Sequence, residues 1–379
     1  MHQRAEGHWR FWIDRGGTFT DIIGLAPDGS THTLKLPSAS SVYDDAAVAA
    51  MRRLLDLSPE ESFPAHRVAE VRVGTTVATN ALLERAGART LFVVTRGFAD
   101  ALLIGDQARP RLFDLVIERP APLYAGVIEA DERLAADGSV LTPLDEAALA
   151  PLLAKAVRDG FESAAVAFVH SDLNPAHEAR AAALACAAGF AYVAVSSEVS
   201  PLPKFVERAE TCVVDAYLTP PLRAYADILA AALPRVDLTF MTSGGGLARA
   251  GAFRGRDAVV SGPAGGVVGT AGIAEAAGAG AVLGFDMGGT STDVCRYAGR
   301  LERRDISRVA GVRLRAPMLD VETVAAGGGS ILHFDGLRAR VGPKSAGAVP
   351  GPACYGRGGP ATVTDANLVL GRLEPSLFP

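Results

Sequence analysis

The sequence predicts an α/β protein made of two domains built on one plan. The chain has 379 residues, which is more than a single hydrophobic core of about 250–300 residues usually serves. Helix-type and strand-type hydrophobic patterns alternate along it, as is typical of layered α/β folds. The segment Asp14–Asp21 recurs as Asp286–Asp293 with six of its eight positions identical. A repeat of this kind indicates that one domain plan occurs twice.

Composition excludes several classes of protein. A hydrophobic fraction of 49% excludes a disordered chain, and a net charge of -5 argues against a nucleic-acid or anionic-membrane binder, which needs a basic face. The four cysteines form no CxxC pair, so reduced thiols in a cytosol are expected rather than disulfides or a zinc site. No secretory leader and no apolar run of about 20 residues is present. We therefore expect a soluble, cytoplasmic protein.

The first forty residues predict a three-stranded meander. Strands are expected at residues 10–14, 21–26 and 31–36. Pro27-Asp28-Gly29 is a turn signal between the last two strands. Between the first two strands lies Arg15–Thr20, a glycine turn rich in hydroxyl groups.

Helices and strands then alternate to about residue 196. Helices are expected at 42–57, 75–86, 144–158 and 175–188, and strands at 68–73, 90–95, 164–170 and 191–196. Gly160 and Gly189 follow two of the helices, where a helix commonly ends. We assign residues 1–195 to the first domain.

The second domain is assigned to residues 196–379. A long helical stretch at 206–232 is expected to be broken at Pro220-Pro221, because proline removes a helical hydrogen bond. A strand at 238–241 and a helix at 267–277 follow, and strands at 281–286 and 293–297 flank the second glycine turn. A short amphipathic helix is expected at 365–373, with an exposed apolar face that favours association.

The two glycine turns predict a phosphate-binding site. Adjacent glycines leave backbone N–H groups uncovered to form an anion-binding nest, and nearby hydroxyl groups can donate to phosphate oxygens. Asp14 and Asp286 precede the turns and suit a Mg²⁺ ion held through water, or a group that orients an attacking atom. One such loop is more often an ordinary hairpin turn, but two in matching contexts favour phosphate. The predicted phosphate-binding residues are Gly16, Gly17, Thr18, Thr20, Gly288, Gly289, Thr290, Ser291 and Thr292.

Paired Asp-x-Gly-Gly-Thr hairpins resemble the actin, hexokinase and heat-shock ATPase superfamily. More closely, the chain resembles the ATP-dependent hydantoinase/5-oxoprolinase A-type family, which includes the ATP-using subunits of acetone-type carboxylases. The motifs that carry this resemblance run nearly end to end, and include IDRGGTFTDI (13–22), TSGGGL (242–247), SGPAGGVVG (261–269), GFDMGGTSTDV (284–294) and GPKSAGAVPGPACYGRGG (342–359). The resemblance implies two duplicated actin/hexokinase-like (ribonuclease H-like) domains, with mixed sheets flanked by helices. Family chains continue further, so the second domain is expected to be incomplete. The family usually carries a His in the segment that here reads Val321-Glu322-Thr323.

The resemblance also implies an activity. It implies ATP and Mg²⁺ as cofactors, Asp14 and Asp286 as catalytic and metal-organising residues, and a five-membered cyclic amide such as 5-oxoproline or a hydantoin as substrate. Phosphorylation of the carbonyl oxygen would make the ring susceptible to water. A B-type subunit or domain would complete the hydrolysis, so a hetero-oligomer is expected. The alternatives are the ATP-using subunit of a ketone carboxylase and a non-catalytic nucleotide-binding fragment.

A third glycine cluster has two interpretations. By resemblance, Gly327, Gly328 and Gly329 form the turn that meets the adenosine of ATP. The other interpretation is a helix cap or a tight turn without a ligand.

Overall fold

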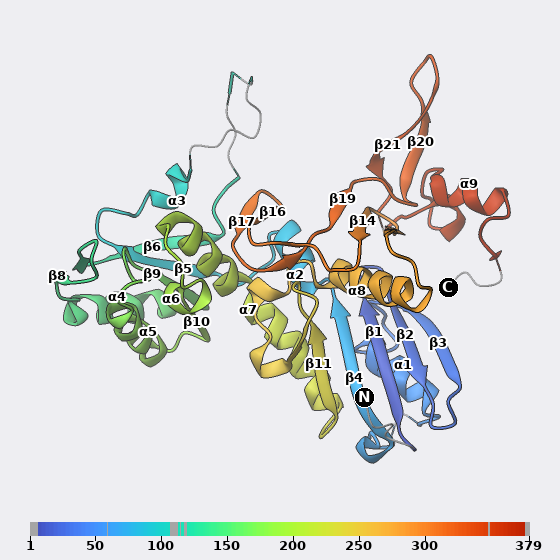
Figure 1. The fold of residues 1–379 in the computed structure, drawn as a ribbon, viewed down its shortest axis with the longest axis horizontal. Helices are drawn as coiled ribbons and strands as arrows, with labels where there is room; N and C mark the ends of the chain where they lie inside the picture. The colour runs from blue at the N-terminus through green and yellow to red at the C-terminus, as the bar shows by residue number, and fades with distance from the viewer. Residues whose placement is uncertain are drawn as a thin grey trace. The chain divides into compact units, whose positions relative to one another are not determined.

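The computed structural model describes residues 7–58, 60–106, 113, 115–116, 120–347 and 349–375. The chain divides into two units (Figure 1). Unit 1 combines the chain up to Gly74 with Ser261–Arg303 and the chain from Leu319 onward, and unit 2 combines Thr75–Val260 with Arg304–Met318. These units are defined by contacts, and the division of the sequence at residue 195 stays a prediction.

The first sheet of unit 1 confirms the predicted meander. Its strands β1 (Trp9–Arg15), β2 (Phe19–Leu25) and β3 (Thr31–Pro37) are antiparallel, and β4 (Val68–Thr75) borders β1 on the other side. Helix α1 (Ala46–Leu54) is capped at its N-terminus by Asp45, whose carboxylate accepts the N–H groups of Ala47 and Val48 in the first turn. Its buried face packs on β1, β2 and β3. Gly24 of β2 is small enough to let Phe11 and Leu54 meet above it.

The second part of unit 1 repeats the hairpin. Helix α8 (Ser261–Ala276) precedes β13 (Val282–Met287) and β14 (Thr292–Tyr297), and β19 (Glu322–Val324) pairs with β14. The hairpin of β20 (Ser330–Phe334) and β21 (Ala339–Ser345) follows. The two strands predicted around the second glycine turn are confirmed, and α8 begins six residues before the predicted start at 267.

Helix α9 is shorter than predicted. It spans Val363–Val369 instead of 365–373. Thr362 and Asp365 form a capping box at its start, and Gly371 takes a left-handed conformation just after its end. The prediction relied on Pro375 to stop the helix, whereas the glycine stops it earlier. Val369 and Leu370 are exposed, as expected for the apolar face.

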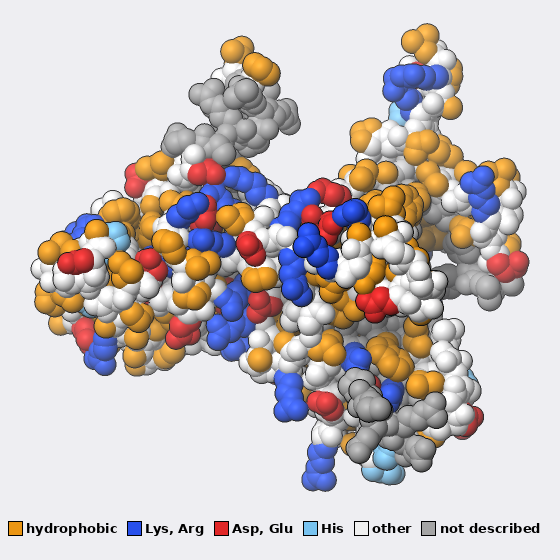
Figure 2. Space-filling view, viewed as in Figure 1, with side chains coloured by type: hydrophobic (Ala, Val, Ile, Leu, Met, Phe, Trp, Pro, Cys, Tyr) orange, Lys and Arg blue, Asp and Glu red, His pale blue; other side chains and the backbone are white. Residues whose placement is uncertain are grey.

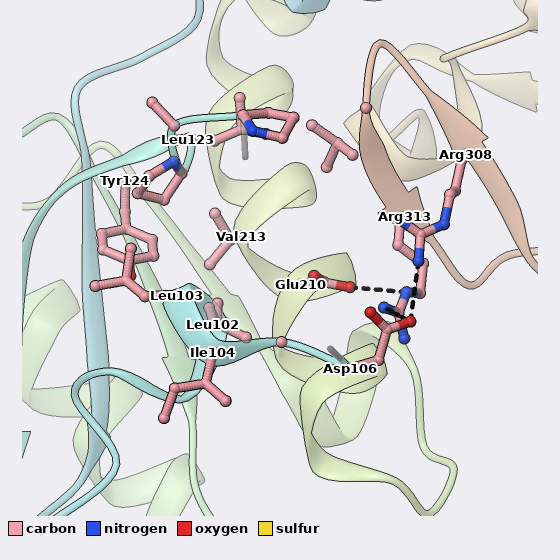
Figure 3. A pocket seen from close by; sticks show the side chains of 16 residues that line it. Leu102, Leu103, Ile104, Asp106, Leu123, Tyr124, Glu210, Val213, Arg308 and Arg313 are labelled. Carbon is pink, nitrogen blue, oxygen red and sulfur yellow. Dashed lines mark hydrogen bonds and ion pairs between the residues drawn. The ribbon is translucent and has the colours of Figure 1, made fainter. Parts of the chain in front are cut away.

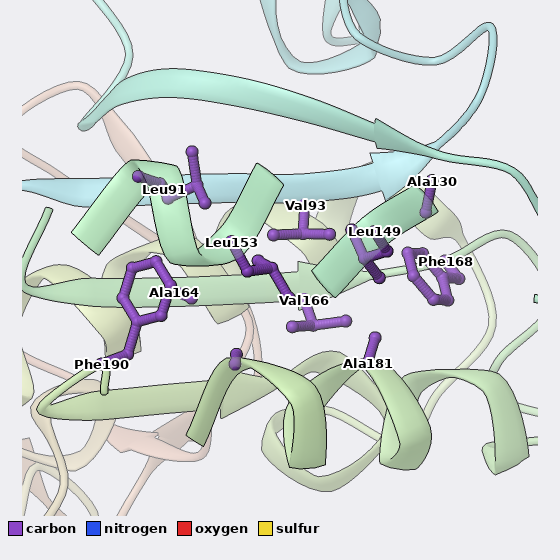
Figure 4. Packing of buried hydrophobic residues seen from close by; sticks show 12 residues of the cluster. Leu91, Val93, Ala130, Leu149, Leu153, Ala164, Val166, Phe168, Ala181 and Phe190 are labelled. Carbon is purple, nitrogen blue, oxygen red and sulfur yellow. The ribbon is translucent and has the colours of Figure 1, made fainter. Parts of the chain in front are cut away.

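Unit 2 is built on a parallel sheet. Strands β5 (Thr90–Thr95), β6 (Tyr124–Ala130), β9 (Ser163–Ala167) and β10 (Tyr192–Val195) all run parallel, in the order β10-β9-β5-β6. Helices α4 (Glu146–Arg158) and α5 (Ala176–Ala188) close a core that includes Val93, Val166 and Phe168 (Figure 4). The β-branched and apolar strand sequences fit burial on both faces. The predicted alternation of helices and strands is confirmed here.

Helix α7 corrects one prediction. It runs without a break from Phe205 to Ala232, through Pro220 and Pro221. Pro221 has no N–H to offer the carbonyl of Tyr217, one turn earlier. That carbonyl instead accepts the N–H of Ala88 at 2.9 Å. A tertiary partner thus satisfies the acceptor that the proline leaves open, and burial against β9 and β10 supports the helix.

The remaining α-helices and strands of the two units are short, and four 3-10 helices of the described residues lie at Ala65–Arg67, Ala250–Ala252, Gly255–Asp257 and Ala353–Tyr355. The short α-helices and strands are α2 (Val77–Leu83), α3 (Ala101–Ile104), β7 (Arg133–Leu134), β8 (Val140–Thr142), α6 (Ser196–Val199), β11 (Asp237–Met241), β12 (Leu247–Arg249), β15 (Arg303–Arg304), β16 (Ser307–Val309), β17 (Val312–Leu314) and β18 (Met318–Leu319). None of the helices in the described part of the chain has the length and hydrophobicity that crossing a bilayer requires.

Candidate phosphate-binding site

The two repeated segments fold into the same hairpin, and both belong to unit 1. Asp14 faces Asp21 across one hairpin, and Asp286 faces Asp293 across the other. In each turn the first glycine N–H donates to the carbonyl three residues later. These bonds join Gly16 to Phe19 at 3.0 Å and Gly288 to Ser291 at 2.9 Å. The sequence repeat is therefore a repeat of backbone geometry.

Each hairpin tip presents backbone donors. Within the described residues, the N–H groups of Gly17, Thr18, Gly289 and Thr290 donate to no protein acceptor. Thr18 and Thr290 are exposed, so their hydroxyl groups are accessible as well. A Cβ added at Gly289 would meet no atom within 4 Å. Open N–H groups beside unoccupied space fit phosphate oxygens.

The last threonine of each turn is buried, and its hydroxyl group stabilises the loop through hydrogen bonds. The Thr20 hydroxyl lies 2.9 Å from the Ser38 hydroxyl, which in turn donates to the Gly16 carbonyl at 2.7 Å. The Thr292 hydroxyl donates to the Ala326 carbonyl at 2.6 Å. Ser38 was missed by sequence reasoning, because nothing in its local pattern marks it as a partner of residue 20. A direct contact of Thr20 or Thr292 with phosphate stays a prediction.

The strand-end carboxylates differ from their cross-strand partners. Asp21 forms an ion pair with Lys35 at 2.7 Å, and Asp293 accepts a hydrogen bond from Thr323 at 2.7 Å. Asp14 and Asp286 make no hydrogen bond or ion pair with the described part of the protein. These two carboxylates therefore remain available to a ligand.

The surroundings of Asp14 raise its pKa. Loss of hydration raises the pKa of Asp14 most, and the negative charges of Asp21 and Asp286 raise it further, against a lowering by Lys35. The effect of Asp286 means that the two strand-end carboxylates lie within electrostatic range of each other. A position shared by like charges favours a bound cation.

The chemistry of these residues fits Mg²⁺ held largely through water. Among the described residues, no group of three or more His, Cys, Asp or Glu side chains could enclose a metal ion. Mg²⁺ commonly keeps several waters and binds one or two carboxylates together with substrate phosphates. Asp14 and Asp286 beside the open N–H groups provide this kind of donor set.

The third glycine cluster lies against the second hairpin. The N–H groups of Gly328 and Gly329 donate to the carbonyls of Gly288 and Gly289 at 2.9 and 2.6 Å. A Cβ at Gly327 would come within 2.7 Å of the Gly289 carbonyl. Only glycine permits this approach. The structure thus brings the third cluster to the second loop, while its contact with adenosine stays a prediction.

A separate cavity of about 750 Å³ lies within unit 2 (Figure 3). Leucine, isoleucine and proline side chains of residues 102–104 and 120–123 line one part of it. Asp106, Glu210 and Arg313 form its charged end, where Arg313 pairs with both acids. Burial raises the pKa of Glu210, against the lowering effect of Arg313. Sequence reasoning missed this cavity because its walls come from three distant segments.

Comparisons with known proteins identify the family of the chain. The Hydantoinase/oxoprolinase N-terminal region family matches residues 10–189, and the Hydantoinase/oxoprolinase family matches residues 208–379. The chain is 45% identical to 5-oxoprolinase 1 of Arabidopsis thaliana over 99% of its own length and 32% of that protein. It is 36% identical to caprolactamase subunit alpha of Pseudomonas jessenii over 97% of its own length and 55% of that subunit.

Solved structures support the same relationship. The ATP-dependent caprolactamase from Pseudomonas jessenii superposes with a TM-score of 0.78 at 35% identity, covering 96% of this chain and 55% of that chain. Nucleotide-free acetone carboxylase superposes with a TM-score of 0.77 at 25% identity, covering 97% and 55%. The chain therefore spans about a third of the 5-oxoprolinase and about half of the other two. On its sequence, its fold and its paired hairpins, the chain belongs to the hydantoinase/oxoprolinase family.

Proposed function

We propose that this chain is the ATP-using component of an enzyme that hydrolyses a cyclic amide. The observation that carries the proposal is the pair of matching hairpins in unit 1, each with open N–H groups and an unpaired strand-end carboxylate. The names of the relatives, 5-oxoprolinase and caprolactamase, support a cyclic amide as substrate. We assign a five-membered ring, of the 5-oxoproline or hydantoin type.

ATP solves a specific chemical difficulty in this reaction. Resonance makes an amide a poor electrophile. In the proposed step the carbonyl oxygen attacks the γ-phosphorus of ATP, the bond from that phosphorus to the bridging oxygen breaks, and ADP leaves. Water then adds to the activated carbon. The ring C–N bond then breaks and the nitrogen takes a proton, which leaves an acyl phosphate. A second water hydrolyses the acyl phosphate to the carboxylate and free phosphate.

The residues of this chain serve mainly to position the reactants and stabilise charge. The N–H groups at residues 17–18 and 289–290 would hold phosphate oxygens, and the hydroxyl groups of Thr18, Thr290 and Ser291 would add donors. The carboxylates of Asp14 and Asp286 would hold Mg²⁺ through water, and the ion would offset charge on the phosphates. Gly327–Gly329 would maintain the second loop in place beside the adenosine.

A partner completes the proposal. Because the chain spans a third to about half of its relatives, and one relative is called a subunit alpha, we propose that a B-type subunit or domain carries out the later steps. The composition and the lack of a membrane-crossing helix among the described residues support a cytoplasmic location.

The fold likeness to acetone carboxylase favours a second candidate. In that case the chain would be the ATP-using subunit of a ketone carboxylase. Steady-state ATP consumption, measured with the chain and its partner, separates the candidates. Stimulation by 5-oxoproline or a hydantoin supports the first, and stimulation only by a ketone with bicarbonate supports the second. ATP binding without turnover on any of these compounds would indicate a nucleotide-binding module.

A further inference from the structure

A smaller cavity of unit 2 carries an excess of positive charge. It measures about 310 Å³ and lies beside β10. Its walls are formed by Cys186, residues 190–195, Glu198, Arg223 and Arg254, and we call it the β10 cavity. Two arginines and one glutamate leave one positive charge in excess there. Figure 2 shows Lys and Arg side chains gathered on the surface where β10 and α7 lie.

The two arginines of the β10 cavity have no acidic partner. Arg223 and Arg254 are half-buried, and neither forms a hydrogen bond or an ion pair with the described part of the chain. Glu198 lines the same cavity without pairing with either of them. By contrast, the buried Arg208 of α7 pairs with Asp172 at 2.8 Å. Partly desolvated guanidinium groups without a counter-charge favour the binding of an anion.

The ring of Tyr192 brings the two arginines to one place. The guanidinium carbon of Arg223 lies over this ring, 4.7 Å from its centre. Tyr192 is held in position because its hydroxyl group donates to Asp215 at 2.6 Å. Burial raises the pKa of Tyr192 and Asp215 raises it further, whereas the positive charge of Arg254 lowers it. Arg254 therefore lies within electrostatic range of the ring on which the other arginine stacks.

The segment that contains Arg254 is fixed to α7. The N–H of Gly255 donates to the Thr219 hydroxyl at 2.9 Å. The N–H of Arg256 donates to the Asp215 carboxylate at 3.1 Å. Both acceptors belong to α7, so the helix that carries one arginine of the cavity also sets the position of the other.

The strand β10 adds backbone groups to the cavity. It forms one edge of the parallel sheet, and β9 is its single partner among the described strands. Alternate N–H and C=O groups of an edge strand have no partner in the ladder. The wall at residues 190–195 therefore offers hydrogen-bond donors and acceptors side by side, which suits a ligand that carries both kinds of group.

We propose that the β10 cavity binds a small amino acid with two carboxylate groups, which meet Arg223 and Arg254 while its ammonium group meets Glu198. A guanidinium group that stacks by its face keeps its edge N–H groups free, and these match the two oxygens of a carboxylate. An amino acid of this kind carries one net negative charge, which neutralises the excess positive charge of the cavity.

The chemistry of the proposed reaction connects this ligand to the enzyme. Opening of a lactam ring leaves a carboxylate and an amine on one molecule, and 5-oxoproline yields a dicarboxylic amino acid. The ligand thus belongs to the product class of the proposed function, and this identification of the ligand as a product rests on that proposal. The binding site itself rests on the arginines and the cavity.

Titration calorimetry of the full chain with L-glutamate tests the site without ATP or a partner. Glutarate, which has the same two carboxylates and no ammonium group, should bind at least about tenfold more weakly, or ~1.4 kcal/mol. Alkylation of Cys186 locates the ligand, because this thiol lines the cavity. At a glutamate concentration of about ten times its Kd, the alkylation should slow by about tenfold.

Matched variants make the test specific. Arg223→Gln and Arg254→Gln should each weaken glutamate binding by at least about tenfold, with an unchanged circular dichroism spectrum. Glu198→Gln should weaken the binding of glutamate and strengthen that of glutarate, because it removes the negative charge that favours the ammonium group. The control is Arg235→Gln, which removes one positive charge at an exposed position outside the cavity and should bind glutamate as the wild type does.

Three results would overturn the proposal. They are no binding of glutamate, binding or Cys186 protection that both arginine substitutions leave intact, and equal affinities for glutamate and glutarate. None of these measurements involves ATP turnover. ATP consumption that lactams fail to stimulate would disprove the proposed function, while glutamate binding that depends on the two arginines would still support the amino-acid site.

Discussion

Asp14 is the carboxylate proposed to organise Mg²⁺ at the first hairpin, and its environment disfavours its negative charge. Its folded-state pKa is raised, chiefly by loss of hydration, so the folded protein holds this proton more tightly than the unfolded chain does. Stability from this group is therefore greatest at low pH and is lost as the pH rises through the raised pKa. At neutral pH the ionised Asp14 lowers the free energy of unfolding.

Asp14→Asn should thus separate stability from turnover. We expect a melting temperature equal to or above that of the wild type at pH 7, because the variant carries no charge there. ATP turnover with the partner present should fall by ~10²-fold or more, as is usual for a group acting on transition-state charge. Asp286→Asn should lose turnover similarly. Thermal unfolding and steady-state assays check this, and normal turnover in either variant would disprove the assigned role.

The pH profile gives a second test of Asp14. The negative charge of Asp21 is one cause of the raised pKa of Asp14, and Lys35, which pairs with Asp21, lowers the pKa of Asp14. Neutralising Asp21 removes the first effect and releases Lys35 from its ion pair. In Asp21→Asn the acidic limb of the ATP turnover profile should therefore shift to lower pH. A shift to higher pH would mean that another group controls that limb.

Two glycines of the second loop should respond differently to substitution. Gly289→Val adds atoms to open space, so the fold should persist while ATP binding weakens by at least about tenfold, or ~1.4 kcal/mol. Gly327→Ala instead displaces the Gly289 carbonyl and should lower both ATP affinity and the melting temperature. Gly272→Ala is the control, since this exposed helical glycine meets nothing within 4 Å. Calorimetry that finds wild-type ATP affinity in Gly289→Val would exclude this loop from the site.

At the scale of elements, the contact between α7 and the segment before β5 is tightly packed. A Cβ at Gly87 would overlap the ring of Tyr217 on α7, next to the carbonyl that accepts the Ala88 N–H. Gly87→Ala should therefore destabilise the protein by ~1–3 kcal/mol, the usual cost of overpacking. Urea unfolding measures this change. A variant with the same free energy of unfolding as the wild type would show that α7 can shift to make room for the added methyl group at no cost in stability.

The capping box of α9 raises the pKa of a nearby thiol, that of Cys354. Asp365 accepts the N–H groups of Cys354 and Thr362 at 2.7 Å. Burial opposes its ionisation, but hydrogen bonds from Cys354 and Thr362 prevail and lower the pKa of Asp365 to about 2. Burial and the Asp365 charge raise the pKa of Cys354 to about 11. The Cys354 thiol is therefore almost fully protonated at pH 8.

Thiol alkylation at pH 8 tests this coupling. Cys186, which is exposed, should react well before Cys354. Asp365→Asn should lower the pKa of Cys354 and speed its alkylation. Loss of the charge from the capping box should cost less than about 1 kcal/mol, because the N-cap residue Thr362 remains. Mass spectrometry of the modified sites gives both rates. Equal rates for Cys354 in wild type and variant would refute the coupling.

Sequence reasoning succeeded where local patterns decide the structure. β5 occupies the predicted residues 90–95, and the meander follows from short apolar strands separated by glycine turns. It failed at Pro220-Pro221, because the Ala88 donor lies far away in sequence. The repeated sequence motif predicted the loop glycines. The hydrogen bond from Ser38 to the first loop and the cavity at Arg313 could not be predicted, because both depend on contacts between residues far apart in the sequence.

At the scale of the whole molecule, the chain passes between the units four times. The junctions lie after Gly74, Val260, Arg303 and Met318. A single cut after Arg303 should therefore leave both fragments associated, because residues before and after the cut contribute to unit 1. Size-exclusion chromatography of the nicked protein should show one peak that separates only in denaturant. Separation under native conditions would contradict this division of the chain.

Because the chain passes back and forth between the units, the parts of the two units are synthesised in a fixed order. Residues 75–260 emerge as one stretch, so the parallel sheet of unit 2 is synthesised complete before the second glycine hairpin exists. The first hairpin emerges before that sheet and its counterpart after it. The two loops thus enter the folding protein 272 residues apart, or about 14–54 s at a translation rate of ~5–20 residues per second. Throughout that interval the nascent chain holds only one hairpin of the proposed nucleotide site, and nucleotide bound there would stabilise the paired arrangement only late in synthesis.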